Sequence, residues 1–398
     1  MLLRFLIFAV LLTAFTVTCK RVEFPPPYEP ECLIGKEDPF DESKSYEVPW
    51  FDVDLDAPAK ERWKHVVRPF KNEILAVFDV LAEFFTIIPG IPIWDLLSNI
   101  TRDAMDKGMI MQPYRDEVEG IAEELGCDLG HLTFLNLFYE MSRFCTSIVA
   151  QTADNKDLYH ARNLDFGQFF MWNIQNKTWG LSEALKRVTI NINFNRGGKL
   201  LFKASTLAGH VGALTAMMPY RFSLSMNAKV EPDLREVIAW YNGNRPNVDF
   251  VMYFDRWLFE NCDSFECAHD MISTKQFLSG AYFILGGNQT GQGTVMVRNR
   301  TDVQFERKLF DGDNDWFVLQ TNYDVPEKDP LYLDDRQDPG ERCMRAMGPS
   351  SVSLSGIYTV LSSKPTLNLT TVHTILMSVT KNIFMAFIQK CPQPCWAF

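Results

Sequence analysis

The sequence predicts an α+β fold in which a β-rich core is flanked by helices. Two observations predict this fold class. From Thr146 onward, short apolar or alternating runs bounded by Gly, Asn and Asp recur along the chain, which is typical of strands. Before that point, apolar residues follow helical spacing instead. A β-rich core with helices on its flanks favours layered packing of the two kinds of element.

The first residues, Met1 to Cys19, have the composition of a secretory signal peptide. Arg4 provides the basic start, and an apolar run follows from Phe5 to Phe15. This run is shorter than the about 20 residues that span a bilayer, so a cleaved signal is favoured over a signal anchor. We therefore expect a mature chain that follows the secretory route.

Next comes an extended lead-in, from Cys32 to Asp56, which is rich in Pro, Asp and Glu. From Glu61 to Ile88 the apolar residues have helical spacing, and Pro69 should kink or split that helix. We expect the apolar face of the helix to lie in the core. A helix on the membrane surface is the alternative, because the face is wide and aromatic. A second helical tract, Glu117 to Met141, stops shortly before Cys145.

The remaining chain alternates between strands and helices. The predicted strands are Thr146–Ala150, Leu158–Asn163, Val188–Phe194, Lys199–Ser205, Phe222–Met226, Ala281–Leu285, Thr294–Val297 and Trp316–Thr321. The predicted helices are Glu231–Tyr241, Val248–Asn261, Ser351–Ser362 and Thr371–Ile388.

Composition excludes some functions and favours others. The formal net charge is −11 and no run of Lys and Arg is present, which argues against a nucleic-acid partner. Nine cysteines on a secretory route favour disulfides, and the Cys391 and Cys395 pair could close a tight loop. Half a metal site is the alternative for that pair, but no matching Cys/His pair stands elsewhere. The acidic pair Asp334-Asp335 is typical of a solvated turn, so we predict no metal and no other cofactor.

Sequons of the form Asn-X-Ser/Thr predict glycosylation. The five acceptors are Asn99, Asn176, Asn288, Asn299 and Asn368.

The chemistry centres on Cys145. It opens a predicted strand, and the next strand ends in Arg162-Asn-Leu-Asp165, so a hairpin would bring Arg162 and Asp165 back beside the thiol. A buried core cysteine is the alternative. His160 should share a face with Arg162, which leaves a papain-like Cys/His pair open, although the papain signature around the cysteine is absent.

Several motifs together carry a resemblance. They are Cys-Thr-Ser-Ile-Val-Ala from Cys145, Arg-Asn-Leu-Asp from Arg162, Gly-Gly-Asn-Gln, Gln-Thr-Asn-Tyr-Asp around Asn322, and Asp-Asp-Arg ending at Arg336. The set resembles the cysteine N-terminal-nucleophile amidase family of acid ceramidase and N-acylethanolamine acid amidase, with a closer likeness to the ceramidases. The likeness covers nearly the whole chain after the signal.

The resemblance implies an αββα sandwich with an added N-terminal helical α-subunit. Residues 1–19 would be the signal peptide, residues 20–144 the helical α-subunit, and residues 145–398 the catalytic β-subunit. Self-cleavage between Phe144 and Cys145 would release the β-subunit, giving an α/β heterodimer from one precursor. The resemblance also implies a disulfide between Cys32 and Cys343 that ties the two products together.

Roles for individual residues follow from the same resemblance. Cys145 would be the nucleophile, and Arg162 and Asp165 would orient its new α-amine and thiol. Asn322 would stabilise the oxyanion, and Arg336 would hold the polar network of the site. A free α-amine, with a pKa near 7.7–8.0, can act as the base for the thiol only if its surroundings favour the neutral amine at acid pH.

One position departs from the family pattern, because Asn227 is followed by Ala228 where a carboxylate is expected. We expect this change to affect the timing or pH dependence of self-cleavage rather than hydrolysis.

Three functions remain open from sequence. The first is hydrolysis of ceramide, a membrane lipid, to sphingosine and a fatty acid. The resemblance then implies the lysosome as destination, with secretion as a second one, and saposin-type activators and anionic lipids as partners. The second is hydrolysis of N-acylethanolamines by the same chemistry. The third, favoured only by Ala228, is a catalytically silent secreted lipid-binding protein.

Overall fold

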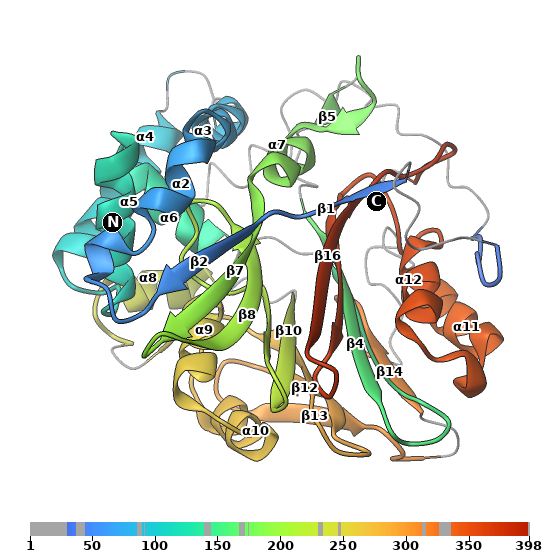
Figure 1. Ribbon diagram of the computed structural model, residues 1–398. Coiled ribbons are helices and arrows are strands. Elements are labelled where there is room, and N and C mark those ends of the chain that lie inside the picture. The colour runs from blue at the N-terminus through green and yellow to red at the C-terminus, as the bar shows by residue number, and fades with distance from the viewer. Residues whose placement is uncertain are drawn as a thin grey trace.

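The described part of the chain folds into two large antiparallel-rich sheets packed face to face between layers of helices (Figure 1). The structure is a computed structural model that describes residues 30–36, 44–85, 90, 92–138, 145–166, 172–173, 175–229, 234–245, 248–312, 316–325 and 336–396. The predicted signal peptide, the Phe144 cleavage position and the Asp334-Asp335 pair lie outside these residues.

One sheet has six strands in the order β1-β16-β15-β4-β3-β14. Their bounds are β1 (Ser45–Glu47), β3 (Cys145–Gln151), β4 (Leu158–Asp165), β14 (Phe317–Gln320), β15 (Thr371–Ser378) and β16 (Ile383–Gln389).

The other sheet has eight strands in the order β13-β12-β11-β10-β9-β8-β7-β2, all antiparallel except the β2–β7 pair. The strands are β2 (Trp50–Asp54), β7 (Thr189–Arg196), β8 (Lys199–Leu207), β9 (Thr215–Met218), β10 (Phe222–Ala228), β11 (Ala281–Gly286), β12 (Gly293–Arg298) and β13 (Val303–Lys308). A separate two-stranded ribbon joins β5 (Trp172–Asn173) to β6 (Thr178–Trp179).

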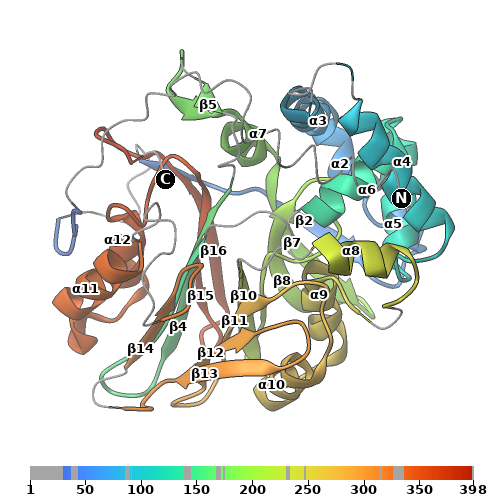
Figure 2. The same ribbon diagram turned by 180° about the vertical axis from the view of Figure 1, so that it is seen from behind.

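Helices cover the outer face of each sheet. On the six-stranded sheet these are α11 (Gln337–Met347) and α12 (Leu354–Ser362), which share a buried cluster with β3, β4 and β14. On the eight-stranded sheet they are α9 (Val251–Asn261) and α10 (Phe265–Thr274), seen from both sides in Figures 1 and 2. The α7 helix (Gly180–Val188) contacts β15, and α8 (Leu234–Tyr241) lies near the N-terminal helices. The predicted helix–sheet–sheet–helix layering is confirmed.

The N-terminal region is helical, as predicted. Its elements are η1 (Ala59–Glu61), α2 (Lys64–Val67), η2 (Arg68–Phe70), α3 (Lys71–Phe85), α4 (Ile93–Asp106), α5 (Tyr114–Leu125) and α6 (Leu129–Phe138). Pro69 falls inside η2 and divides the tract predicted over residues 61–88. The second predicted tract is divided at Gly126, whose φ of 63° ends α5. Helix α4 was not predicted from the sequence.

The apolar face of α3 lies in the core, which confirms the first of the two interpretations of this helix. Ile74, Val77 and Leu81 are fully buried. The membrane-surface alternative is not supported, because this face is covered by the protein itself. In the described residues no helix combines the length and apolar character needed to cross a bilayer.

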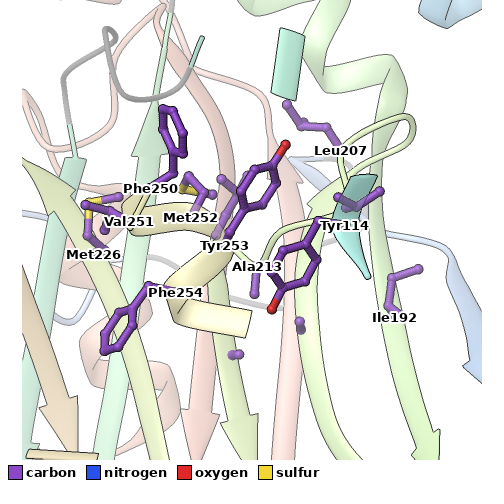
Figure 3. Packing of buried hydrophobic residues seen from close by; sticks show 14 of the residues in the cluster. Tyr114, Ile192, Leu207, Ala213, Met226, Phe250, Val251, Met252, Tyr253 and Phe254 are labelled. Carbon is purple, nitrogen blue, oxygen red and sulfur yellow. The ribbon is translucent and has the colours of Figure 1, made fainter. Parts of the chain in front are cut away.

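These helices and the sheet share one core (Figure 3). The ring of Tyr114 on α5 stacks on Tyr253 of α9 with centroids 4.9 Å apart, beside Ile192 of β7. Close helix packing is also built in: a Cβ on Gly120 of α5 would lie 2.0 Å from the carbonyl oxygen of Lys60. The N-terminal region is therefore part of the same folded body as the sheets.

The extended lead-in joins both sheets. β1 pairs with β16 at the edge of the six-stranded sheet, and β2 pairs with β7 at the edge of the eight-stranded sheet. The segment therefore crosses from one sheet to the other within a few residues (Figure 1).

One secondary-structure prediction is wrong. Residues 371–388 were expected to be helical, but they form the β15–β16 hairpin. Every residue of β15 is buried, because one face packs between the sheets and the other under α12. A strand buried on both faces lacks the polar alternation that distinguishes it from a buried helix, so periodicity alone misassigns it.

Three disulfides are present in the described residues. Cys32 is joined to Cys343 and Cys391 to Cys395, the pairs named from the sequence. The third, Cys262–Cys267, joins the end of α9 to the first turn of α10, and the sequence left its pairing open.

The sequons differ in exposure. Asn99, Asn176 and Asn288 are exposed and Asn299 is partly exposed. The predicted glycan on Asn368 does not fit the structure. This side chain is 2% exposed and its Oδ1 accepts bonds from Thr370, so a glycan has no room there in the folded protein.

Candidate active site

The β3–β4 hairpin places Arg162 beside Cys145, as the sequence predicts. Cys145 is opposite Leu164 and Ser147 is opposite Arg162 in the register of the two strands. Alternation then directs the side chains of Cys145, Ser147 and Arg162 to the same face, between the sheets. The Nη2 group of Arg162 donates to Cys145 Sγ at 2.8 Å.

The guanidinium of Arg162 is fixed from three sides. Its Nη1 donates to the carbonyl oxygen of Leu214 and to Thr215 Oγ1 at 2.8 Å, and its Nη2 donates to the Met226 carbonyl at 2.9 Å. The side chain is 0% exposed. A buried positive charge at this distance stabilises negative charge on sulfur, which is what a thiol nucleophile requires.

The backbone nitrogen of Cys145 is held by a second network. It donates to Asn322 Oδ1 at 2.5 Å, and Arg336 Nη2 donates to the same oxygen at 3.0 Å. Arg336 Nη1 donates to Asp165 Oδ2 at 2.5 Å, and Asp165 Oδ1 accepts from Thr371 at 2.6 Å. The structure thus brings together all five residues that the sequence selected as catalytic.

Asp165 is connected to the Cys145 nitrogen through the same network. Its carboxylate is bonded by Arg336 and Thr371, and Arg336 also donates to the Asn322 oxygen that accepts from the Cys145 nitrogen. The expected role of Asp165 in orienting the amine stays a prediction, because in the uncut chain this nitrogen is a peptide N–H.

Asn322 uses both ends of its amide. Its Oδ1 accepts from Cys145, while its Nδ2 donates to the carbonyl oxygen of Ala228 at 2.8 Å. A side-chain amide carries two N–H bonds, so one hydrogen remains for an oxyanion. The contact with Ala228 uses only its backbone, so the missing carboxylate at that position leaves this bond in place.

His160 does not serve Cys145. It lies opposite Val149, well along β3 from the thiol, and its ring bonds to Ser223 Oγ at 2.9 Å and Ser225 Oγ at 2.8 Å. Burial, with a smaller effect of the Arg162 charge, lowers the pKa of His160 to about 3. The ring stays neutral at acid pH, and the structure gives no support to a Cys/His pair.

A ladder of polar side chains between the sheets was not predicted from the sequence. Ser225 Oγ donates to Ser147 Oγ at 2.9 Å, and Ser147 Oγ donates to Asn227 Oδ1 at 2.8 Å. Asn227 in turn donates to the Gln320 and Thr321 carbonyls, just before Asn322. The signal was present in Phe222–Ala228, where every second residue is polar although all are buried.

This geometry can support attack on an amide carbonyl. A thiol with a buried guanidinium beside it, and a nitrogen of the same residue within a polar network, place nucleophile and base on one residue once that nitrogen is an amine. No cluster of three or more potential metal-ligating side chains occurs in the part of the chain that the structure describes.

The fold and the site define a hydrolase of linear amide bonds in the N-terminal-nucleophile class. Residues 145–323 match the family described as linear amide C–N hydrolases, choloylglycine hydrolase family. Residues 46–109 match the beta subunit of N-acylethanolamine-hydrolyzing acid amidase. A solved structure, the Caenorhabditis elegans N-acylethanolamine-hydrolyzing acid amidase ortholog, is similar with a TM-score of 0.50 and 30% identity, covering 59% of this chain and 93% of that one.

Relatives that match over nearly the full length of the chain define its family more narrowly. The chain is 64% identical to a probable acid ceramidase of Caenorhabditis elegans over 94% of this chain and 93% of the relative. It is 36% identical to the acid ceramidase of Homo sapiens over 97% of this chain and 98% of the relative. The chain belongs to the acid ceramidase family.

Proposed function

We propose that this protein hydrolyses the amide bond of ceramide to sphingosine and a free fatty acid, with Cys145 as the N-terminal nucleophile. The observation that carries the proposal is the pair of contacts on Cys145: the thiol touches Arg162 and the backbone nitrogen touches Asn322. The naming of full-length relatives as acid ceramidases supports the choice of substrate.

The first chemical step is self-cleavage. The thiol attacks the carbonyl carbon of Phe144, the C–N bond breaks, and the acyl group passes from nitrogen to sulfur. Water then hydrolyses the thioester, which releases the Phe144 carboxylate and leaves Cys145 with a free α-amine and thiol.

Turnover repeats this chemistry on the lipid. The α-amine takes the thiol proton while sulfur attacks the amide carbonyl, and the second Nδ2–H of Asn322 stabilises the oxyanion. The proton passes to the leaving amine, sphingosine departs, and water cleaves the acyl thioester to release the fatty acid. Arg162 stays beside the sulfur through both halves, where it favours the thiolate as leaving group.

The processed form that we propose has two pieces, residues 20–144 and residues 145–398. The disulfide between Cys32 and Cys343 would hold them together after the cut. We further propose passage through the secretory pathway to the lysosome, with removal of residues 1–19 and glycans on Asn99, Asn176, Asn288 and Asn299. Saposin-type activators and anionic lipids are the partners expected at the membrane.

A second candidate substrate is an N-acylethanolamine. It is favoured by the family match over residues 46–109 and by the similar solved structure, both named for that activity. A lipid-binding protein without turnover is the third candidate, and the complete Cys145 cluster weighs against it.

One assay separates the three candidates. Purified processed protein is given ceramide in anionic vesicles or an N-acylethanolamine, and product is measured between about pH 4 and 7. We expect faster release from ceramide, with most activity at about pH 4.5–5.5, since protonation of the acidic surface reduces its repulsion from anionic lipid. Faster cleavage of the N-acylethanolamine would give the second function, and no turnover of either substrate the third.

A further inference from the structure

The connector between β8 and β9, residues 208–214, is buried along its whole length. Connections of this kind usually run over the surface, because their backbone groups need hydrogen-bond partners. Here the partners come from the N-terminal helices and from the neighbouring strands and α9. The connector also ends where the guanidinium of Arg162 is bound, so its position decides where that charge lies.

The distal end of the connector holds Arg162. The carbonyl oxygen of Leu214, the last residue of the connector, accepts from Arg162 Nη1. The next residue, Thr215, accepts from the same nitrogen through its hydroxyl at 2.8 Å. The other guanidinium nitrogen is the one that reaches Cys145 Sγ at 2.8 Å. A shift of the connector would therefore move the charge away from the sulfur.

Asn136 on α6 forms two hydrogen bonds with the proximal end of the connector. Its Nδ2 donates to the Gly209 carbonyl at 2.8 Å, and its Oδ1 accepts from the Val211 backbone N–H at 2.9 Å. Asn136 is 1% exposed. A primary amide donates and accepts at the same time, so this one short side chain satisfies both backbone groups.

A buried ion pair holds the connector at a second point. The Val211 carbonyl accepts from Arg256 Nη1 at 2.8 Å, and Arg256 Nη2 donates to Glu117 Oε1 of α5 at 2.8 Å. Both charged side chains are at most 1% exposed. Glu117 is also bonded by Arg62 Nη1 and by Trp63 Nε1, each at 2.7 Å. Glu117 is thus fixed within the N-terminal region and holds Arg256 against the connector.

We infer that the N-terminal helices position the nucleophile through this connector, with Asn136 and Glu117 as positioning residues for Arg162. Both residues precede Cys145 in the chain, so both would belong to the separate N-terminal piece after self-cleavage. The inference rests on the proposed function for the identity of the nucleophile. It assigns the N-terminal piece a continuing role in turnover, in addition to its part in the fold.

The test replaces Asn136 by Leu, which keeps the approximate size and removes both the donor to Gly209 and the acceptor for Val211. The matched control is Asn191→Leu on β7, another fully buried asparagine, whose Nδ2 donates to the Val48 carbonyl at 3.1 Å away from the site. Both are made in a Cys127→Ser background, because Cys127 is the other free cysteine of the described residues. Three quantities are measured on processed protein: kcat, KM and the rate of Cys145 alkylation by iodoacetamide.

For Asn136→Leu we expect kcat and the alkylation rate to fall about tenfold with KM unchanged, as for a displaced catalytic group. Asn191→Leu should keep both rates. Folded Asn136→Leu with control-like kcat and alkylation would overturn the inference, and so would a change confined to KM. Alkylation needs no substrate, so the result is independent of whether ceramide is the natural lipid.

If Asn136→Leu does not fold, Thr215→Val tests the same inference from the other end of the connector. This variant keeps the side-chain shape and removes the hydroxyl that accepts from Arg162 at the far end of the connector. Its alkylation rate should also fall about tenfold. A wild-type rate in folded Thr215→Val would show that the connector does not position the guanidinium.

Discussion

Cys145 is held at both of its reactive atoms, and by different parts of the chain. The sulfur contacts Arg162 on the adjacent strand, and the nitrogen contacts Asn322, 177 positions further along. Such a division suits the chemistry that we propose, in which Cys145 attacks its own peptide bond and then uses the freed nitrogen as a base. The two networks would hold the sulfur and the nitrogen in place before and after that cut.

Cys145→Ala should abolish self-cleavage and lipid hydrolysis together, because one thiol performs both reactions. The fraction of cut chain on a reducing gel and the release of fatty acid check this. Cys127→Ser is the matched control, because Cys127 is the other free cysteine of the described residues and burial raises the pKa of its thiol to about 11, which disfavours the thiolate. Normal processing of Cys145→Ala would mean that another protease makes the cut.

Asn322→Ala should lower kcat by about 10²–10³-fold, the usual effect of losing one oxyanion donor. It should also slow self-cleavage, because Asn322 Oδ1 holds the Cys145 nitrogen. The processed fraction is therefore purified before kcat is measured, with Asn261→Ala, an exposed asparagine at the end of α9, as control. Wild-type turnover of processed Asn322→Ala would remove this residue from the oxyanion site.

At the scale of elements, α10 is fastened to the eight-stranded sheet by a pH-dependent pair. His269 Nε2 lies 2.8 Å from Glu306 Oε1 of β13. The hydrogen bond with Glu306 raises the pKa of His269. Burial opposes ionisation of Glu306, but bonds from His269, Thr294 and Lys308 outweigh it and lower the pKa of Glu306 to about 2.

The signs of these shifts define a pH window. The raised pKa of His269 stabilises the fold below the ordinary histidine value, about 6.5, and this contribution is lost as pH rises through the raised value. The lowered pKa of Glu306 stabilises the fold above about 4.5, and that contribution is lost as pH falls toward 2. The pair is therefore fully formed at about pH 4.5–6.5.

His269→Gln should reduce the free energy of unfolding by about 1 kcal/mol at pH 5, a modest value because the pair is partly exposed. The reduction should be smaller at pH 8 and above, because the histidine is then neutral in the original protein as well. Chemical denaturation at the two pH values measures the difference. His65→Gln is the control, since His65 is exposed and bonds only to the Asp52 carbonyl in the described contacts. An equal loss at both pH values would show that the interaction does not depend on the histidine charge.

At the scale of the whole molecule, the N-terminal region and the sheets form one body with several fastenings. The Cys32–Cys343 disulfide is covalent, β1 and β2 extend both sheets, and Glu117 forms a buried ion pair with Arg256. A cut before Cys145 would therefore leave the two pieces associated.

Active enzyme should accordingly show one band on a non-reducing gel and two on a reducing gel. Cys343→Ser should give two bands under both conditions. It should still copurify as a complex, because the noncovalent contacts remain. A single uncut chain in fully active enzyme would contradict the two-piece form.

Much of the secondary structure of this protein is determined locally, by the sequence of each segment. Eight strands were found because alternation and turn residues mark them: β3, β4, β7, β8, β10, β11, β12 and β14. The short strands β5, β6 and β9 and the largely exposed β13 were missed. The β3–β4 hairpin followed from the short spacing between Cys145 and Arg162. The amphipathic pattern of α3 already indicated a buried face. The five catalytic candidates were found through motif resemblance, because spacing alone does not relate Asn322 and Arg336 to Cys145.

Tertiary structure alone decided the rest, since it depends on contacts between distant segments. The strand identity of β15 came from burial on both faces, which removes the polar alternation that marks a strand. The sequon at Asn368 predicts a glycan, but the fold buries this side chain. The chain of hydrogen bonds from Asp165 through Arg336 and Asn322 to the Cys145 nitrogen exists only because strand pairing in the six-stranded sheet places β4, β3 and β14 side by side. Sequence selects the residue types, but distance and burial set which atom each one holds, and these arise only in the folded chain.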